Sequence, residues 1–478
     1  MNLEFLLERF GQSARTQEIA NKILLPNPQR ISCDHVAGSF ASFLFSALYK
    51  KEELSGHNHL FILEDAEEAA YFHNDIENLI DPIDLFYFPT SFKSNKNFKV
   101  QSSSHVMLRT EMLTRFAAGG NKKIVITYPE ALIEKVVQAK TLSGHIILIK
   151  VNDRLDTDAL MARLVGLGFE RTDFVYEPGQ FAMRGGIFDI YSFGNEKPYR
   201  VELFGQDVDS IRIFDPETQL SERKLLQVSI IPNADGVFEE TDKIPFFDFV
   251  PSNTIVYSSN WQLFLDRYQD HEDNLNLFLE RKDDVAAVRD SDEKISELTI
   301  NDFTPYVEME KKLDDFTLVE LSHASSLPRA NHVLRFDVKP QPSFNRQFEL
   351  LIKDLKSHEA ARHQIYIFAE NPKQLERLYS IFSDLKAEIN FVPIAKSLHS
   401  GFVDNENGIV VYTDHQIFER YHKFSIKNGY SKKQNLTLKE LTTLSVGDYV
   451  THIDHGIGKF GGLQKIQVEG KTQEAIKL

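Results

Sequence analysis

The sequence predicts a multidomain α/β protein that carries a small inserted antiparallel domain. Two apolar runs of strand length, at 59–63 and 123–127, are each followed by helix-like sequence, as parallel βα units require. Between 168 and 221 the pattern changes to short alternating strands separated by turn residues, which indicates an antiparallel-rich α+β insert. After 336, amphipathic helices and short strands alternate again, which indicates a further compact α/β domain.

Composition restricts the classes of function. A length of 478 residues corresponds to about three to four domains. The net charge of −16 argues against a chain that wraps DNA non-specifically, because phosphate binding needs a positive face. No signal stretch opens the chain and no run of about 18 apolar residues occurs, so we expect a cytoplasmic protein without a membrane partner. Cys33 is the single cysteine, and we expect it to be a small core residue.

The first α/β domain is expected in two parts, at 1–132 and 221–335, with the insert at 133–220. A helix is expected at 2–10, and Pro129 is placed to open another at 130–137. The charged stretch 266–297 is expected to be a solvated helical region.

The further α/β domain is expected at 336–420. Strands are expected at 364–369 and 408–413, and Asn371-Pro372 is expected to start a helix between them. The apolar faces of its two helices consist of Phe344, Phe348, Leu351, Ile352 and Leu355, and of Leu375, Leu378, Phe382 and Leu385. Residues 421–443 form a linker, and we favour a solvated connector over a nucleic-acid contact for its basic part.

The octet 35–42, HVAGSFAS, is a phosphate loop without its essential residues. A working loop reads G-x-x-x-x-G-K-[ST], in which backbone N–H groups surround the phosphates and the lysine reaches their oxygens. Here the two glycines are replaced by His35 and Phe40, and the lysine by Ala41. Gly38, Ser39 and Ser42 are what remains of the motif, and Phe40 is expected to fill the nucleotide's space. The intact motif occurs nowhere in the chain, so no ATP hydrolysis is expected from it.

The insert places guanidinium groups near large apolar side chains. Arg171 precedes its first strand, and Arg184 precedes Gly185-Gly186, where a turn would aim the arginine outward. Phe188 follows two residues later. Arginine beside an aromatic residue is typical of a protein-binding hot spot. The alternative is that Phe188 belongs to the core and that the arginines are solvated.

The segment 168–221 resembles the insert shared by the excision-repair helicase UvrB and the transcription-repair coupling factor family. The shared motifs are G-[YF]-x-R-x-D, P-G-x-F-x-x-R-G-G-I-x-D-I and R-[VI]-E-L-F-G-x-[DE]-[VI]-[DE]-S-I-R-x-F-D-P-x-T-Q. In both families this insert docks UvrA. The resemblance implies that Arg171, Arg184 and Phe188 contact UvrA, although Glu170 stands where some members carry a basic residue.

Three features favour the coupling factor family over UvrB. The phosphate loop is degenerate, and the region 87–107, which corresponds to UvrB's tyrosine-rich hairpin, is short and keeps only Y-F-P. The stretch 444–463, LSVGDYVTHIDHGIGKFGGL, resembles the start of the coupling factor's CarD-related domain for RNA polymerase. The resemblance implies an incomplete Tudor- or SH3-like β-barrel at 444–478 that binds the polymerase β subunit around Ile476 and Leu478 by strand addition. We expect no metal at His452, Asp454 and His455, because a turn explains them.

The resemblance implies a part of a transcription-coupled repair factor that recruits UvrA and RNA polymerase and has no catalytic residue or cofactor of its own. The intact protein would be an ATP-dependent DNA translocase, with ATP, Mg²⁺ and most DNA contacts in a motor beyond Leu478. A C-terminal domain that masks the UvrA-docking surface would also lie there, so we expect this chain to bind UvrA without ATP. A UvrB-type DNA helicase and a CarD-type transcription regulator are the alternatives.

Overall fold

The computed structural model describes residues 2–94, 97–235, 238–285, 298–420, 449–452, 456–459, 461–468 and 471–477. The chain divides into two compact units, 1–429 and 430–478. In the described residues no helix is both long enough and apolar enough to cross a membrane.

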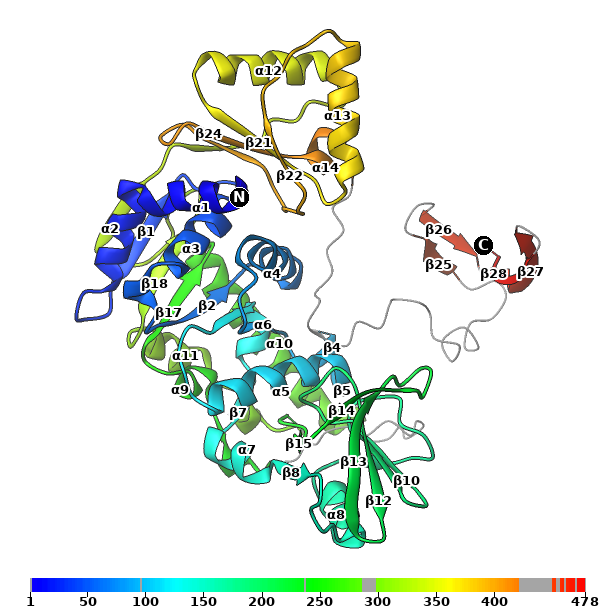
Figure 1. The fold of residues 1–478 in the computed structure, drawn as a ribbon. Helices are drawn as coiled ribbons and strands as arrows, with labels where there is room; N and C mark the ends of the chain where they lie inside the picture. Colours follow the sequence, from blue (N-terminus) through cyan, green and yellow to red (C-terminus); the bar gives the residue numbers. More distant parts are fainter. Residues whose placement is uncertain are drawn as a thin grey trace. The chain divides into compact units, whose positions relative to one another are not determined.

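The first domain is built on a parallel sheet in the order β19-β1-β18-β17-β2-β6-β3 (Figure 1). Every pair of neighbouring strands in it is parallel, as the two βα units in the sequence predict. Its strands are β1 Arg30–Asp34, β2 Asn58–Ile62, β3 Leu85–Phe88, β6 Ile124–Thr127, β17 Thr254–Ser258, β18 Thr317–Leu321 and β19 His332–Arg335. Cys33 in β1 is fully buried, as expected, and burial raises the pKa of its thiol.

Helices pack against this sheet and against one another. The α3 helix follows the degenerate phosphate loop and contacts α1, α2 and α4, while α10 contacts α6 and α11. The helices are α1 Asn2–Gln12, α2 Ala14–Ile23, α3 Phe40–Tyr49, α4 Ala66–Ile80, α5 Ser103–Ala117, α6 Pro129–Leu132, α7 Ala139–His145, α9 Phe246–Phe249, α10 Trp261–Val285 and α11 Tyr306–Leu313. Short 3₁₀ turns lie at η1 Glu52–Leu54, η2 Glu240–Asp242 and η3 Ile300–Asp302.

One local expectation for this domain is wrong. Pro129 does open a helix, but α6 ends at Leu132, and β7 Val136–Val137 pairs with β16 Lys243–Ile244 instead of continuing the helix. In the region 87–107, which the sequence predicts to be short, β4 Phe92–Ser94 pairs with β5 Asn97–Gln101 in a short hairpin. Phe92 and Phe98 of this hairpin are buried, and the Phe98 ring lies 5.4 Å from that of Phe278 in α10.

The insert is a six-stranded sheet in the order β14-β13-β12-β11-β10-β9, with α8 Thr157–Gly166 beside it (Figure 1). Its strands are β9 Glu170–Arg171, β10 Gln180–Arg184, β11 Ile187–Ile190, β12 Tyr199–Phe204, β13 Asp207–Phe214 and β14 Ser221–Leu225. The chain enters through β8 Ile147–Lys150 and leaves through β15 Gln227–Ile230, and these two strands pair with each other. One face of the sheet packs on α8 around a core that includes Leu160 and Leu164.

The further α/β domain is a five-stranded mixed sheet in the order β20-β23-β24-β21-β22. Its strands are β20 Val338–Pro340, β21 Gln364–Phe368, β22 Val392–Ile394, β23 Phe402–Asp404 and β24 Ile409–Thr413, and its helices are α12 Phe348–Ala360, α13 Pro372–Asp384 and α14 Asp414–Ile417. The Asn371 side chain caps α13 by accepting from the Lys373 N–H, as expected. Arg9 of α1 donates to Gln364 and to the Asn407 carbonyl, which ties α1 to this domain.

The second unit contains two antiparallel strand pairs in its described residues. The strands β25 Tyr449–His452 and β26 Gly456–Lys459 form one pair, and β27 Leu463–Val468 and β28 Lys471–Ile476 form the other. Ile476 ends β28 opposite Leu463, whereas Leu478 and the predicted linker at 421–443 lie outside the described residues. Asp454 and His455 also lie outside them. The chain is thus a mixed α/β protein with one parallel sheet and several antiparallel ones.

Candidate functional site

A buried carboxylate on the outer face of the insert's sheet holds two arginines. Asp189 in β11 lies opposite Ala182 in β10 and Arg200 in β12. Its Oδ2 accepts from Nη2 of Arg184 at 2.5 Å and from Nη2 of Arg200 at 2.9 Å, and its Oδ1 accepts from Nε of Arg200 at 2.8 Å. The hydrogen bond to Asp189 raises the pKa of Arg200. Because a buried carboxylate is stable only when it is paired, these charge-assisted bonds fix both guanidinium groups.

Arg184 connects this carboxylate to the loop 172–178. Nη1 of Arg184 donates to the Asp173 carbonyl at 2.5 Å, and its guanidinium carbon lies 4.5 Å from the centre of the Phe174 ring. The arginine reaches this position because the chain reverses at Gly185, whose φ of +59° suits glycine. The expected turn is confirmed, and Arg184 lies on the outer face with 32% of its side chain exposed.

Arg200 connects the same carboxylate to the turn 215–220. Its Nη1 donates to the Gln219 carbonyl at 3.0 Å, and its guanidinium lies 4.3 Å from the centre of the Phe214 ring. Nε2 of Gln219 donates in turn to the carbonyl of Val175, which is fully buried. The loop and the turn are therefore held together over Asp189, and this explains why an outward-facing carboxylate is buried.

The structure corrects the expected role of Phe188 and places Arg171. Phe188 is 0% exposed and stacks on Phe181 at 5.9 Å, on the sheet face that packs against α8. Side chains alternate between the two faces of a strand, so Asp189 points outward and Phe188 points inward. Phe188 is thus a core residue and cannot touch a partner in this conformation. Arg171 lies exposed in the edge strand β9, opposite Phe181 of β10.

Sequence reasoning missed Asp189, Arg200 and two exposed aromatic residues. Phe174 and Tyr176 on the loop 172–178 are 47% and 50% exposed, and their ring centres lie 6.5 Å apart. The available signal was the run F-V-Y directly after the R-x-D motif, because it places three consecutive apolar residues next to the turn residues E-P-G.

The degenerate phosphate loop binds another part of the chain. Ser39 donates its N–H to the Ser400 carbonyl at 3.0 Å, and its Oγ accepts from the Ser400 N–H at 2.9 Å. Gly38 has a φ of +54°, and a Cβ on it would lie 2.5 Å from the Gly401 carbonyl oxygen. A loop of the further α/β domain therefore takes an N–H group that a working phosphate loop offers to a nucleotide.

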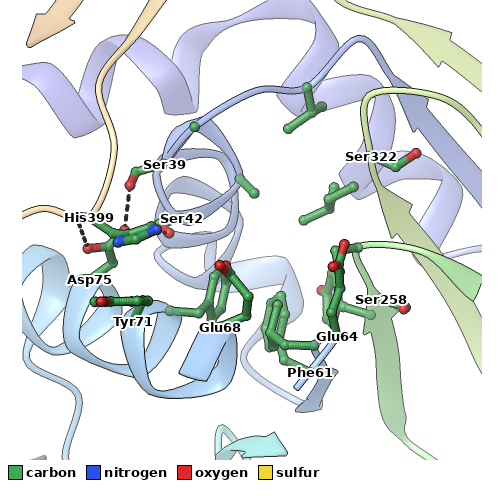
Figure 2. Close-up of a pocket in the computed structure, with 18 of the residues that line it drawn as sticks. Ser39, Ser42, Phe61, Glu64, Glu68, Tyr71, Asp75, Ser258, Ser322 and His399 are labelled. Carbon is green, nitrogen blue, oxygen red and sulfur yellow. Dashed lines mark hydrogen bonds between the residues drawn. The ribbon is translucent and has the colours of Figure 1, made fainter. Parts of the chain in front are cut away.

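Asp75 in α4 stabilises this contact (Figure 2). Its Oδ2 accepts from Oγ of Ser39 at 2.6 Å and of Ser42 at 3.3 Å, and its Oδ1 accepts from the His399 N–H at 2.8 Å. Burial raises the pKa of Asp75 to about 7, although these hydrogen bonds oppose the shift. The Tyr71 ring stacks on that of His399 at 3.9 Å.

A cavity of about 230 Å³ remains beside the loop, at the carboxyl ends of β1, β2, β17 and β18. Ala41 and Ser42 line it, but Phe40 does not: this ring packs against Phe10 and Phe402 in the core. The expectation that Phe40 fills the nucleotide's space is therefore wrong. The cavity's lining includes Glu64, Glu68 and Asp75 but no lysine or arginine among the described residues. Such a wall repels phosphate, and the described residues contain no cluster suited to a metal ion.

Comparisons with known proteins agree with this architecture. The UvrB interaction domain family matches residues 147–235, and the CarD-like/TRCF RID domain family matches residues 444–478. Transcription-repair-coupling factors from two strains of Staphylococcus aureus, bovine RF122 / ET3-1 and MRSA252, are each 25% identical to the chain over 505 residues, 93% of the chain and 43% of the relative. The factor from Staphylococcus haemolyticus is 26% identical over 88% of the chain and 41% of the relative.

The chain thus spans less than half the length of the curated relatives that it matches. Its two domain matches lie in the order that the sequence motifs predict, on the six-stranded insert and on the β-strands of the second unit. Together, these findings show that the chain is similar, over most of its length, to transcription-repair-coupling factors.

Proposed function

We propose that the chain recruits partners in transcription-coupled nucleotide excision repair and docks UvrA through the outer face of the β9–β14 sheet. The observation that carries this proposal is the fixed group of Arg184, Arg200 and Asp189 beside exposed aromatic rings, inside the segment that matches the UvrB interaction domain. Arginine and aromatic side chains dominate the binding energy of protein interfaces.

The direct test is titration of UvrA with this chain by calorimetry, in the absence of nucleotide. Saturable binding is expected, and Arg184→Ala is expected to weaken it by about 2 kcal/mol or more. Arg329→Ala, far from the insert in sequence, is the control for loss of a guanidinium. An unchanged affinity for Arg184→Ala would remove Arg184 from the docking surface, and absence of wild-type binding would refute the proposal.

The second partner that we propose is the β subunit of RNA polymerase, bound by residues 444–478. The match to the CarD-like/TRCF RID domain supports this, and the paired strands β25–β28 fit part of an SH3-like barrel. An edge strand can bind a partner by strand addition, and we place the contact around Ile476 and Leu478. A pull-down with polymerase should succeed with the full chain and fail with residues 1–443. UvrA binding by 1–443 should persist, whereas a pure transcription regulator would bind polymerase and not UvrA.

We also propose that this chain does not hydrolyse ATP. Ala41 replaces the phosphate-loop lysine, Ser400 occupies the Ser39 N–H, and carboxylates line the neighbouring cavity. In the intact protein, ATP and Mg²⁺ would serve a DNA translocase, located in the length of the relatives that this chain does not span, which displaces stalled polymerase. DNA-stimulated ATP turnover by the chain in a coupled assay would contradict the proposal and favour a UvrB-type helicase.

A further inference from the structure

The loop 172–178, hereafter the aromatic loop, exposes two large rings in the middle of the UvrB interaction domain match. Phe174 and Tyr176 are about half exposed, and Phe174 lies against Arg184 on the sheet face away from α8. Exposed aromatic residues next to arginine mark protein-binding surfaces, because the rings bury a large area at a low cost in side-chain entropy. Neither ring is needed for the insert's core, which forms on the opposite face of the sheet.

The aromatic loop is fixed along its length. The N–H groups of Tyr176 and Glu177 both donate to Oε1 of Gln180, at 2.8 and 3.0 Å. Thr172 donates its N–H to the Phe181 carbonyl at 2.9 Å, and Val175 is buried beneath the loop. Rings that are held in place before binding lose little entropy when a partner covers them, so this loop can supply affinity at a small ordering cost.

Arg184 fastens the aromatic loop to the sheet. One of its Nη atoms donates to Asp189 and the other to the Asp173 carbonyl, while the guanidinium plane contacts the Phe174 ring. This bridge needs the two-pronged shape of arginine, because a lysine ammonium cannot span both acceptors and the ring in the same geometry. The charge of Arg184 is already paired with Asp189, which leaves it less suited to a direct ionic contact with a partner.

We propose that Phe174 and Tyr176 are the apolar anchors by which the chain docks UvrA, and that Arg184 and Asp189 are positioning residues that hold the aromatic loop. This inference rests on the proposed UvrA binding. Two such anchors require an apolar recess on the partner surface of UvrA.

The anchors are tested by calorimetric titration of UvrA with the variant Phe174→Ala/Tyr176→Ala of the full chain. Its affinity is expected to fall about tenfold or more, because truncation of interface aromatics commonly has effects of this size. Phe5→Ala is the matched control, since Phe5 in α1 is exposed to a similar extent, 53%, outside the insert. If wild type fails to bind UvrA, the proposed function fails. If wild type and the double variant bind equally well, the anchor assignment is overturned.

The positioning role is tested by Arg184→Lys, which keeps the charge and loses the bridge, in a double-mutant cycle with the anchor variant. In the wild-type background the lysine variant is expected to bind UvrA about fivefold or more weakly, and in the anchor-deleted background less than about twofold more weakly. Additive losses in the two backgrounds would make Arg184 a direct contact and overturn the positioning role. Asp189→Asn should behave as Arg184→Lys does, and thermal unfolding of each variant shows whether the insert remains folded.

Discussion

Substitutions at Phe188 separate a core residue from a binding residue. The side chain is fully buried, faces α8 and stacks on Phe181. Phe188→Ala removes most of a buried aromatic ring and is expected to destabilise the insert by about 3–5 kcal/mol. Phe188→Leu keeps an apolar side chain that fills much of the same space, so its expected cost is only about 1 kcal/mol. The insert should therefore stay folded in the leucine variant.

The assay combines urea unfolding, followed by circular dichroism, with calorimetric titration of UvrA. For Phe188→Leu we expect a small decrease in the unfolding midpoint and a UvrA affinity equal to that of wild type. The alanine variant should unfold at clearly lower urea and bind UvrA only under conditions in which the insert is folded. A leucine variant of wild-type stability that binds UvrA about tenfold more weakly would refute the core assignment and restore Phe188 as a contact residue.

Three further predictions concern buried groups of the first domain. Arg109→Ala removes a fully buried guanidinium that donates to Asp235 at 2.8 Å. The buried carboxylate of Asp235 then loses this partner, so urea unfolding should show a loss of about 3–5 kcal/mol in the free energy of unfolding. A loss under about 1 kcal/mol would contradict this. Because folding raises the pKa of Asp75 to about 7, its stabilising contribution is complete below the pKa of the unfolded chain and is lost as pH rises through about 7. Wild type should thus lose more stability between pH 5 and pH 8 than Asp75→Asn, and equal losses would argue against the raised pKa. Gly38→Ala forces alanine into a positive φ against the Gly401 carbonyl and should lower the free energy of unfolding by about 2 kcal/mol. An unchanged unfolding midpoint in urea would show that the loop can move away.

The local patterns of the sequence predicted the parallel first domain, the antiparallel insert and the Asn371 cap. These features depend on the spacing of apolar residues and on turn chemistry within a few residues. Phe188 shows where such reasoning ends. A shift of one residue along a strand moves a side chain to the opposite face, so a motif that contains both Phe188 and Asp189 does not indicate which one is buried.

The contacts made over long stretches of chain could not be predicted. The sequence shows that the phosphate loop has lost its lysine, but not that Ser39 binds Ser400, more than 300 residues away. Nor does it show that Phe40 packs among Phe10 and Phe402 and leaves the cavity open. These outcomes depend on how the further α/β domain packs on the first one, and no local pattern specifies that packing.

Recruitment of UvrA by this chain is tested most directly by a calorimetric titration of UvrA with the chain, without nucleotide and then with ATP and Mg²⁺. We predict saturable binding of equal affinity under both conditions, with no ATP consumed by the chain itself. Absence of binding, or binding by this chain that requires it to hydrolyse ATP, would contradict the claim that it recruits UvrA through the fixed outer face of the β9–β14 sheet.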